Sequence, residues 1–305
     1  MKTFFVVNPK SGNGATGRRW AELAASIART LSDFGVEFTK GPLDAVHVTR
    51  KALKSGYDCV VAVGGDGTIN EVTNGFFEDG KVINANAALG VLPRGTGGDF
   101  RKTFDWNLDA DAAIRRLKSP DTRPFDVGKL DFLDHEGKQA TRYFANICSF
   151  GVSGLVDPEV NKTSKALGGT VSFMWGSLKA MRKYKDQRVR MTLDDKALEE
   201  VMVTTLSVAN GKYFGGGMKV APDADVSDGL FDVVVWSGYG LTDFVVRSKG
   251  IYSGEHVKWK GTRIVRARKL VAESDEKVLI DCDGEQPGTL PCTMTILPAA
   301  IRLKV

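Results

Sequence analysis

One segment decides the fold class of this chain: Val61-Ala62-Val63-Gly64-Gly65-Asp66-Gly67-Thr68-Ile69-Asn70-Glu71. Its apolar first part predicts a buried parallel strand, and a helical pattern follows the glycines. Glycines let the backbone turn tightly and approach a ligand, because no Cβ stands in the way. Backbone N–H groups at a strand-to-helix turn favour phosphate, helped by the positive end of the helix. The segment therefore predicts a phosphate-binding turn in an α/β domain.

Two familiar phosphate motifs do not describe this turn. No Gly-Lys-Ser/Thr follows, so it is not a Walker motif, and its position and glycine spacing differ from the dinucleotide fingerprint. An ordinary tight turn in an α/β domain is the alternative. Two further loops of similar composition argue against that alternative.

Length and composition are those of an ordinary globular chain. The 305 residues are 42% apolar and 26% charged, which suits one large domain or two smaller ones. No stretch approaches the ~20 apolar residues of a membrane span, and residues 1–7 are too short for a signal peptide, so we expect a first strand there. The net charge of +5 permits an anionic partner without requiring one. Scattered cysteines without metal-ligand spacing indicate reduced packing thiols in a cytoplasmic protein: Cys59, Cys148, Cys282 and Cys292.

The first half of the chain alternates strands with helices. Apolar runs predict strands at residues 2–8, 36–39, 57–63 and 88–92, and helical spacing predicts helices near 20–31, 44–55 and 69–77. This alternation builds a parallel sheet, with ligands at the carboxyl ends of its strands. The loops 8–14, 64–68 and 94–99 each follow a strand, so all should open on one edge and form a nucleotide site.

The second half reads as a mostly antiparallel β domain. Strands are predicted at residues 125–132, 142–150, 187–193, 201–208, 229–236, 263–272 and 277–283, with helical stretches near 167–185 and 241–252. The last residues alternate and are expected to return to the first domain as a strand. The predicted domains are therefore 1–124 together with 293–305, and 125–292.

The ordered set of motifs resembles the catalytic domain of diacylglycerol kinases, which bacterial soluble lipid kinases and sphingosine kinases share. The motifs are residues 8–12, 64–68 with 70–75, 92–100, 222–231 and 281–285, and together they span essentially the whole chain. The resemblance implies an ATP-dependent lipid kinase. It also implies an α/β plus all-β fold, with an N-terminal nucleotide domain related to NAD kinases and phosphofructokinases and a C-terminal β-sandwich.

The resemblance places the ATP contacts in the first domain. They map onto Asn8, Pro9, Lys10, Ser11, Gly12, Thr39, Gly65, Asp66, Gly67, Thr68, Ile69, Asn70, Glu71 and Thr96. Backbone donors of the glycine loop can hold the phosphates, and the hydroxyls of Ser11 and Thr68 add side-chain donors. Asp66 cannot attract bare phosphate, so it either makes a metal-mediated contact or orients the loop by hydrogen bonds.

The resemblance also makes Asp283, in Asp283-Gly284-Glu285, the general base that removes the proton from the lipid hydroxyl. A base so placed is typically worth ~10²–10⁴ in rate. Asp-Gly is also a common turn dipeptide, so a plain hairpin is the alternative. A base on one domain and phosphate loops on the other would put the reaction in a cleft between them.

A magnesium site is implied at residues 225–230. Carried over by position, its ligands are Asp228 and the carbonyl groups of Asp225 and Leu230. Hard oxygen donors in a tight loop suit Mg²⁺, although a plain Asp-Gly turn is an equal alternative.

One residue departs from the family pattern. The family loop reads Gly-Thr-x-Asn-Asp-Phe, whereas Gly98 stands here in place of the asparagine. A side-chain hydrogen bond is lost and the loop gains freedom. The departure affects the detail of nucleotide or lipid binding more than the reaction class.

A basic amphipathic segment, residues 162–190, is the expected membrane contact. One helical face carries Leu167, Val171, Met174, Leu178 and Met181, and eight basic residues accompany a single acid, Asp186. Such a helix can lie on an anionic bilayer or pack into a core with a solvated basic face, and both remain open. His256 matches a family pattern, and a structural hydrogen bond is its expected role.

These observations predict a cytoplasmic, peripherally membrane-associated lipid kinase that uses ATP and Mg²⁺. Diacylglycerol, giving phosphatidic acid, is the favoured acceptor, with sphingoid bases, other glycerolipids and polyprenols as further acceptors. A kinase of a soluble substrate, of the NAD kinase type, shares the Gly-Gly-Asp-Gly-Thr loop, and a non-catalytic nucleotide or lipid sensor is a second alternative. No nucleic-acid partner is expected, and the sequence leaves the oligomeric state open.

Overall fold

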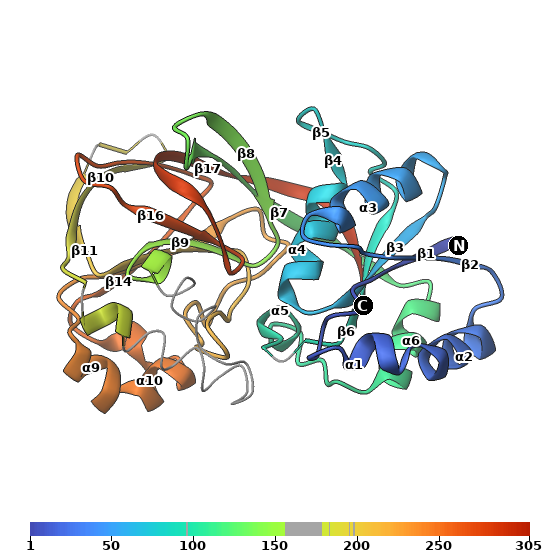
Figure 1. Cartoon of the computed structure of the whole chain (residues 1–305). Helices are drawn as coiled ribbons and strands as arrows, with labels where there is room; N and C mark the ends of the chain where they lie inside the picture. The colour runs from blue at the N-terminus through green and yellow to red at the C-terminus, as the bar shows by residue number, and fades with distance from the viewer. Residues whose placement is uncertain (96, 156–178, 183, 195, 198) are drawn as a thin grey trace. The chain divides into compact units, whose positions relative to one another are not determined.

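The computed structural model describes residues 1–95, 97–155, 179–182, 184–194, 196–197 and 199–305 (Figure 1). The chain divides into two compact units. Unit 1 comprises Met1–Val127 and Pro298–Val305, and unit 2 comprises Gly128–Leu297. The last strand, β17 (Glu285–Lys304), begins in unit 2 and ends in unit 1.

Unit 1 is built on a parallel sheet. Its strands are β1 (Thr3–Val7), β2 (Phe34–Phe38), β3 (Cys59–Gly64) and β6 (Ala88–Pro93), in the order β6-β3-β1-β2. The end of β17 pairs in parallel with β6 through Arg302 and Leu303. The two central strands, β3 and β6, are buried along their whole length, as strands covered on both faces must be.

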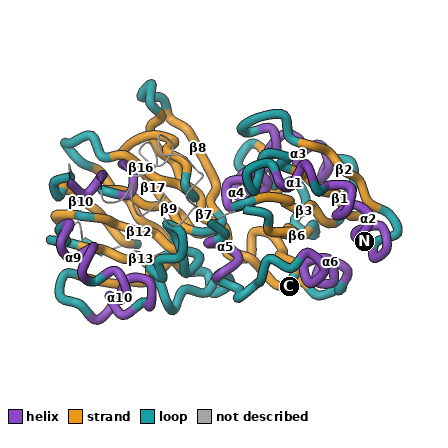
Figure 2. Tube along the Cα trace, turned by 60° about the horizontal axis from the view of Figure 1, so that its bottom comes forward, coloured by secondary structure: helices purple, strands orange, loops and turns teal. Residues whose placement is uncertain are grey.

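Helices cover both faces of this sheet (Figure 2). The helices α3 (Asp44–Lys54) and α4 (Asp66–Gly75) pack together, and α2 (Trp20–Thr30) packs with α6 (Ala110–Lys118). The α2–α6 side has one apolar core, in which Ile27 and Leu117 meet Phe5 and Val61. Short elements connect these layers: α1 (Ala15–Arg18), α5 (Asp99–Lys102) and the hairpin of β4 (Phe77–Glu78) and β5 (Lys81–Val82).

Unit 2 is a sandwich of antiparallel strands. One layer has the order β14-β13-β12-β9-β16, and β16 continues through a hairpin into β17. In the other layer β10 pairs with β11 and β15, β15 and β7 pair with β17, and β7 pairs with β8. The bounds are β7 (Thr122–Asp134), β8 (Gln139–Phe144), β9 (Ile147–Gly151), β10 (Gln187–Leu193), β11 (Glu199–Val203), β12 (Thr205–Ala209), β13 (Phe231–Trp236), β14 (Thr262–Ala267), β15 (Lys269–Glu273) and β16 (Leu279–Cys282).

Three segments predicted as single strands are each two strands, so that part of the sequence prediction was wrong. Residues 142–150 divide between β8 and β9, 201–208 between β11 and β12, and 263–272 between β14 and β15. In each case the first strand pairs in one layer and the second in the other. The chain turns a corner from sheet to sheet, and apolar residues continue through the corner because both layers face one core.

The helix after the glycine turn also begins earlier than predicted. It starts at Asp66 rather than Ile69, because Gly65 has extended backbone and its carbonyl group already accepts the Ile69 N–H at 3.1 Å. Residues 66–68 therefore form the first turn of α4. In unit 2, α9 (Leu241–Val246), α10 (Ser248–Ser253) and the 3₁₀ helix η2 (Glu255–Lys258) follow β13. Among the described residues, no helix has the length and apolar character needed to span a bilayer.

Candidate nucleotide and catalytic sites

The three glycine-rich loops lie side by side at one edge of the unit 1 sheet. They follow β1, β3 and β6, which are adjacent parallel strands, so their carboxyl ends share this edge. Asn8 Nδ2 donates to Thr68 Oγ1 at 3.1 Å, which joins the first loop to the second. The Arg94 N–H donates to Gly64 O at 2.7 Å, which joins the second loop to the third. The loops thus converge as the strand pattern predicts.

Glycine is required where these loops touch. A Cβ on Gly95 would lie 2.5 Å from the Cα of Gly65, and a Cβ on Gly12 would lie 2.9 Å from Arg94 O. Both neighbours are backbone atoms, which cannot move aside as a flexible side chain can. The glycines therefore serve the packing of loop against loop, and they leave backbone N–H groups uncovered by side chains.

Asp66 orients the third loop. Its carboxylate accepts the backbone N–H groups of Asp99 and Phe100, each at 3.1 Å, at the start of α5. Burial, and then the nearby Asp99 carboxylate, raise the pKa of Asp66, while these backbone hydrogen bonds lower it. These hydrogen bonds support the role of orienting the loop, which was one of the two expected for Asp66 beside a metal-mediated contact.

The first loop is held by its own side chains. Asn8 Oδ1 accepts the Lys10 N–H at 3.0 Å, and Ser11 Oγ donates to Asn8 O at 2.9 Å. Ser11 Oγ also lies 2.7 Å from Thr16 Oγ1. Pro9 O accepts the Gly17 N–H at 3.1 Å. The Ser11 backbone N–H donates to the same Asn8 O at 3.2 Å. Ser11 can therefore offer a phosphate its hydroxyl or its N–H only by giving up a bond to Asn8 O.

The predicted residues of α4 mostly support the helix layer. Glu71 Oε2 accepts the Ala45 N–H at 3.1 Å, in the first turn of α3. Ile69 and Asn70 are only 2% and 3% exposed. Any nucleotide contact at Ile69 would therefore come from its backbone.

Three predicted residues complete the set. Thr39 directly follows β2, and its N–H donates to Val7 O at 2.9 Å, which places it beside the end of β1. Gly67 lies in the first turn of α4. Thr96 lies outside the described residues.

Arg94 belongs to this edge although the sequence analysis did not select it. Its side chain is half-buried, and within the described part of the chain its guanidinium has no hydrogen-bond or ion-pair partner. Burial, and then the neighbouring Arg19, lower the pKa of Arg94, while the nearby Glu22 carboxylate raises it. A cation kept partly from water and beside a second cation favours an anion as its partner.

Asp283 lies in unit 2, in the hairpin between β16 and β17. Asp283 and Gly284 both have positive φ, 51° and 88°, as a two-residue type I′ turn requires. The Asp283 carboxylate accepts three backbone N–H groups, from Ala145 at 2.8 Å, Asn146 at 3.1 Å and Ile147 at 2.9 Å. The hairpin alternative is thus realised, and the side chain also fixes the corner between β8 and β9. The role of general base stays a prediction.

The predicted magnesium loop is closed by hydrogen bonds and an ion pair. Asp225 Oδ1 accepts the Ser227 N–H at 3.0 Å, and Asp228 Oδ1 accepts the Leu230 N–H at 3.0 Å. Asp228 Oδ2 forms an ion pair with Arg266. Within the described ranges, no three His, Cys, Asp or Glu side chains gather closely enough to hold a metal ion. These residues do not fit a cation site as they stand, because Mg²⁺ would have to displace Arg266.

His256 is fully buried and structural. Its Nε2 lies 3.0 Å from Val220 O, and its ring packs against Trp236 and Trp259. Burial lowers the pKa of His256, which favours the neutral ring. The structure gives the hydrogen bond that we expected of this residue.

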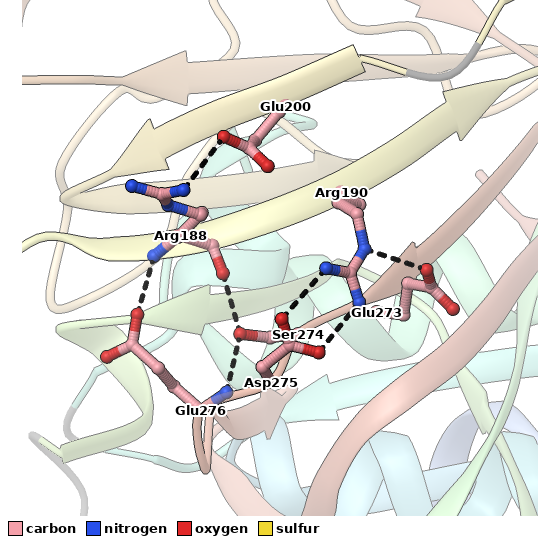
Figure 3. Close-up of polar contacts among 7 residues, drawn as sticks. All are labelled: Arg188, Arg190, Glu200, Glu273, Ser274, Asp275 and Glu276. Atoms are coloured by element: carbon pink, nitrogen blue, oxygen red, sulfur yellow. Dashed lines mark hydrogen bonds and ion pairs between the residues drawn. The ribbon is translucent and has the colours of Figure 1, made fainter.

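The basic segment 162–190 is only partly described, and two of its cations are already paired. Arg188 and Arg190 lie on β10, the strand predicted at residues 187–193 (Figure 3). Arg190 contacts Asp275 and Glu273, each at 2.9 Å, and Arg188 lies 3.3 Å from Glu200. These two arginines therefore tie strands together. The expected apolar face lies outside the described residues, apart from Met181.

Unit 2 contains a small apolar pocket that opens to solvent and has about 30 Å³ of free space. Its wall includes Met181, Phe214, Met218, Trp236, Phe244 and Ile251. Two polar atoms belong to wall residues and have no partner within the described ranges, Ser153 Oγ and Trp236 Nε1. Its apolar wall suits the end of an aliphatic chain, and wall side chains would have to move aside for more of the chain to enter.

Comparisons with known proteins place the chain in a family. Residues 2–130 match the Diacylglycerol kinase catalytic domain, and residues 146–305 match the YegS C-terminal NAD kinase beta sandwich-like domain. A protein of Bacillus subtilis (strain 168) named diacylglycerol kinase is 26% identical, over 94% of this chain and 90% of its own length. One of the same name from Mycobacterium tuberculosis (strain CDC 1551 / Oshkosh) is 26% identical, over 99% and 94%.

Solved structures agree on the fold. A crystal structure from Bacillus anthracis str. Sterne covers 99% of this chain and 97% of its own, with a TM-score of 0.77 and 23% identity. The chain belongs to the diacylglycerol kinase-like family of lipid kinases, with a catalytic α/β domain and a C-terminal β-sandwich. It is a kinase, and the family implies ATP as its phosphoryl donor.

Proposed function

We propose that this kinase transfers the γ-phosphoryl group of ATP to a hydroxyl group of diacylglycerol, which gives phosphatidic acid. In the reaction the acceptor oxygen bonds to Pγ, the bond from Pγ to the β,γ-bridging oxygen breaks, and ADP leaves. The hydroxyl proton passes to a base. The observation that carries the choice of a lipid is the apolar pocket of unit 2, since a dinucleotide or another soluble polar acceptor would have no use for it.

The nucleotide phosphates are assigned to the loop edge of unit 1. Glycines at 65 and 95 let these two loops pack closely, and we assign the phosphates to the backbone N–H groups there. Lys10 is exposed at the same edge, and Arg94 supplies a cation without a protein partner within the described ranges. Charge-assisted hydrogen bonds of this kind are the strong ones, and in phosphoryl transfer they orient and neutralise the donor.

The acyl chain is assigned to the pocket of unit 2. Trp236 Nε1 is a donor only, and at this position it could pair with an ester carbonyl oxygen of the lipid. A buried donor left without a partner costs free energy, so a ligand that satisfies it is favoured over a pure hydrocarbon.

Asp283 is proposed as the base. Its three backbone donors fix the carboxylate in one orientation. Because the same donors stabilise the charged form, the proton would go to the lone pair that they leave free. Mg²⁺, bound with ATP, would neutralise charge on the phosphates. Because the residues of the Asp225–Leu230 loop do not fit a cation site as they stand, no step is assigned to that loop.

The test is transfer of labelled γ-phosphate from ATP, with Mg²⁺, to separate acceptors in mixed micelles. The panel is diacylglycerol, monoacylglycerol, sphingosine and a polyprenol, with NAD as the soluble acceptor. We expect labelled phosphatidic acid as the main product. Preferential labelling of another lipid would replace diacylglycerol as the acceptor, and labelled NADP without any labelled lipid would overturn the proposal.

A further inference from the structure

The helix α9 exposes apolar side chains to solvent. Val246 is 75% exposed, Val245 54% and Leu241 37%, while Phe244 of the same helix is buried. Val246 is the most exposed of the large apolar side chains in the described ranges. Adjacent exposed apolar residues on a short helix indicate an interaction site.

Unpaired cations surround this helix. Lys249 follows on α10, and Lys258 and Lys260 flank Trp259; all three lysines are exposed and have no ion-pair partner in the described part of the chain. Arg247, at the end of α9, links this helix to the segment with Lys258 and Lys260, because its guanidinium lies 5.4 Å from the centre of the Trp259 ring. The nearby acids are Asp243, which lies 3.6 Å from Arg247, and the exposed Glu255.

We infer that this surface, made by Leu241, Val245, Val246, Lys249, Lys258 and Lys260, docks the enzyme on an anionic lipid bilayer. The inference rests on the proposed function, which requires an acceptor held in a membrane. Apolar side chains at the tip of a short helix can enter the boundary between head groups and acyl chains. Lysines beside them are attracted to anionic head groups.

The same two helices form part of the acyl-chain pocket. Phe244 of α9 and Ile251 of α10 both line it, on the inner side of the exposed surface. A lipid that leaves the bilayer beneath α9 and α10 therefore has a short route to the pocket. This position favours a bilayer over a protein as the occupant of the surface.

Vesicle sedimentation of the full chain tests the inference. The vesicles are phosphatidylcholine alone, or phosphatidylcholine with phosphatidylglycerol, at low and high salt. We expect binding to the anionic vesicles that salt weakens. The double variant Val245→Glu/Val246→Glu should bind at least about tenfold more weakly, since burial of even one valine side chain is worth that much.

Two further variants serve as comparison. Val271→Glu introduces one glutamate at a valine that is 37% exposed on β15, and it should bind like the wild type, whereas the matched single variant Val246→Glu should bind more weakly. Lys249→Glu/Lys258→Glu should lose the preference for anionic vesicles. Wild-type affinity in the Val245/Val246 variant, or wild-type binding that ignores vesicle charge, would overturn the docking surface.

A kinase assay with a short-chain diacylglycerol dispersed in solution separates this inference from the proposed function. A docking defect leaves phosphorylation of the dispersed acceptor intact in the Val245/Val246 variant. If the wild type phosphorylates no lipid in either form, the proposed function fails, whatever the vesicles show.

Discussion

Asp194 and Asp283 hold two corners of the unit 2 sandwich in the same way. Both have a φ of 51° and both directly follow a strand. Asp194 Oδ1 accepts the backbone N–H groups of Arg268 and Lys269, at 2.8 and 2.9 Å, where β14 gives way to β15. Asp283 does the same for three N–H groups where β8 gives way to β9. At each of these corners, backbone N–H groups that no longer donate to a neighbouring strand donate to an aspartate carboxylate instead.

The pair allows a stability prediction. Asp283→Asn should lower the free energy of unfolding by about 1–3 kcal/mol, because its NH₂ group cannot accept the Ala145 N–H. Asp194→Asn should lower it less, because its amide oxygen can still accept both N–H groups, though more weakly. Urea unfolding of the two variants measures the effect. If Asp283→Asn leaves the free energy unchanged, its carboxylate does not hold the corner.

Gly98 is expected to tolerate asparagine better than alanine. Its φ is 65°, and a Cβ would lie 2.6 Å from Arg101 Nε. Asparagine adopts this left-handed conformation more readily than alanine, whose penalty is about 1–2 kcal/mol. Thermal unfolding of Gly98→Asn and Gly98→Ala should rank the wild type and the Asn variant above Ala. The reverse order of Asn and Ala would contradict the backbone argument.

The first half of the chain was well predicted because its signals are local. Strands of one parallel sheet end where their apolar runs end, so the loops 8–14, 64–68 and 94–99 could be placed together from the sequence. The start of α4 was missed, because glycines at 65 and 67 look like loop residues although Asp66 already begins the helix.

The corners of unit 2 were not predictable by the same means. At 204 and 268 the chain changes layers without a glycine or proline, and buried residues continue on both sides. What marks a corner is a hydrogen bond to a distant residue, such as that from the Ala145 N–H to the Asp283 carboxylate, which no local pattern records. Arg94 was missed because an arginine in a polar loop looks like an ordinary solvated charge, and its burial appears only in three dimensions.

Arg94→Ala should weaken ATP binding without weakening the fold. We expect the KM for ATP to rise by about tenfold or more, since a hydrogen bond to a charged group is worth that much. The melting temperature should stay the same or rise, because the variant removes a desolvated cation beside Arg19. Arg29→Ala is the control, since Arg29 is exposed in the last turn of α2, and it should leave the KM for ATP unchanged. A fall in stability with an unchanged KM would show that Arg94 serves the fold alone.

His256 makes stability depend on pH. Its pKa is lowered in the folded protein from the ordinary 6.5, so below that pH the unfolded chain takes up a proton that the folded chain refuses. Stability should therefore fall as the pH drops through about 6.5, by at most about 1.4 kcal/mol per pH unit.

The variant His256→Gln tests this dependence. It should be less stable than the wild type at pH 8, and the difference should shrink between pH 6.5 and 5. His135→Gln, at an exposed histidine of the same unit, should leave the pH profile unchanged. If the stability of His256→Gln depends on pH as that of the wild type does, other groups cause the dependence.

The central claim is tested most directly by the initial rate of γ-phosphate transfer from ATP to diacylglycerol, measured for the wild type, Asp194→Asn and Asp283→Asn under conditions where all three are folded. Asp194→Asn can keep both of its corner bonds through Oδ1, whereas Asp283→Asn loses the bond from the Ala145 N–H, and comparing folded variants removes the effect of that loss on stability. We expect Asp194→Asn to stay within a few-fold of the wild type and Asp283→Asn to lose about 10²–10⁴ in rate. Equal losses in the two variants, or no transfer to diacylglycerol by the wild type, would contradict the account.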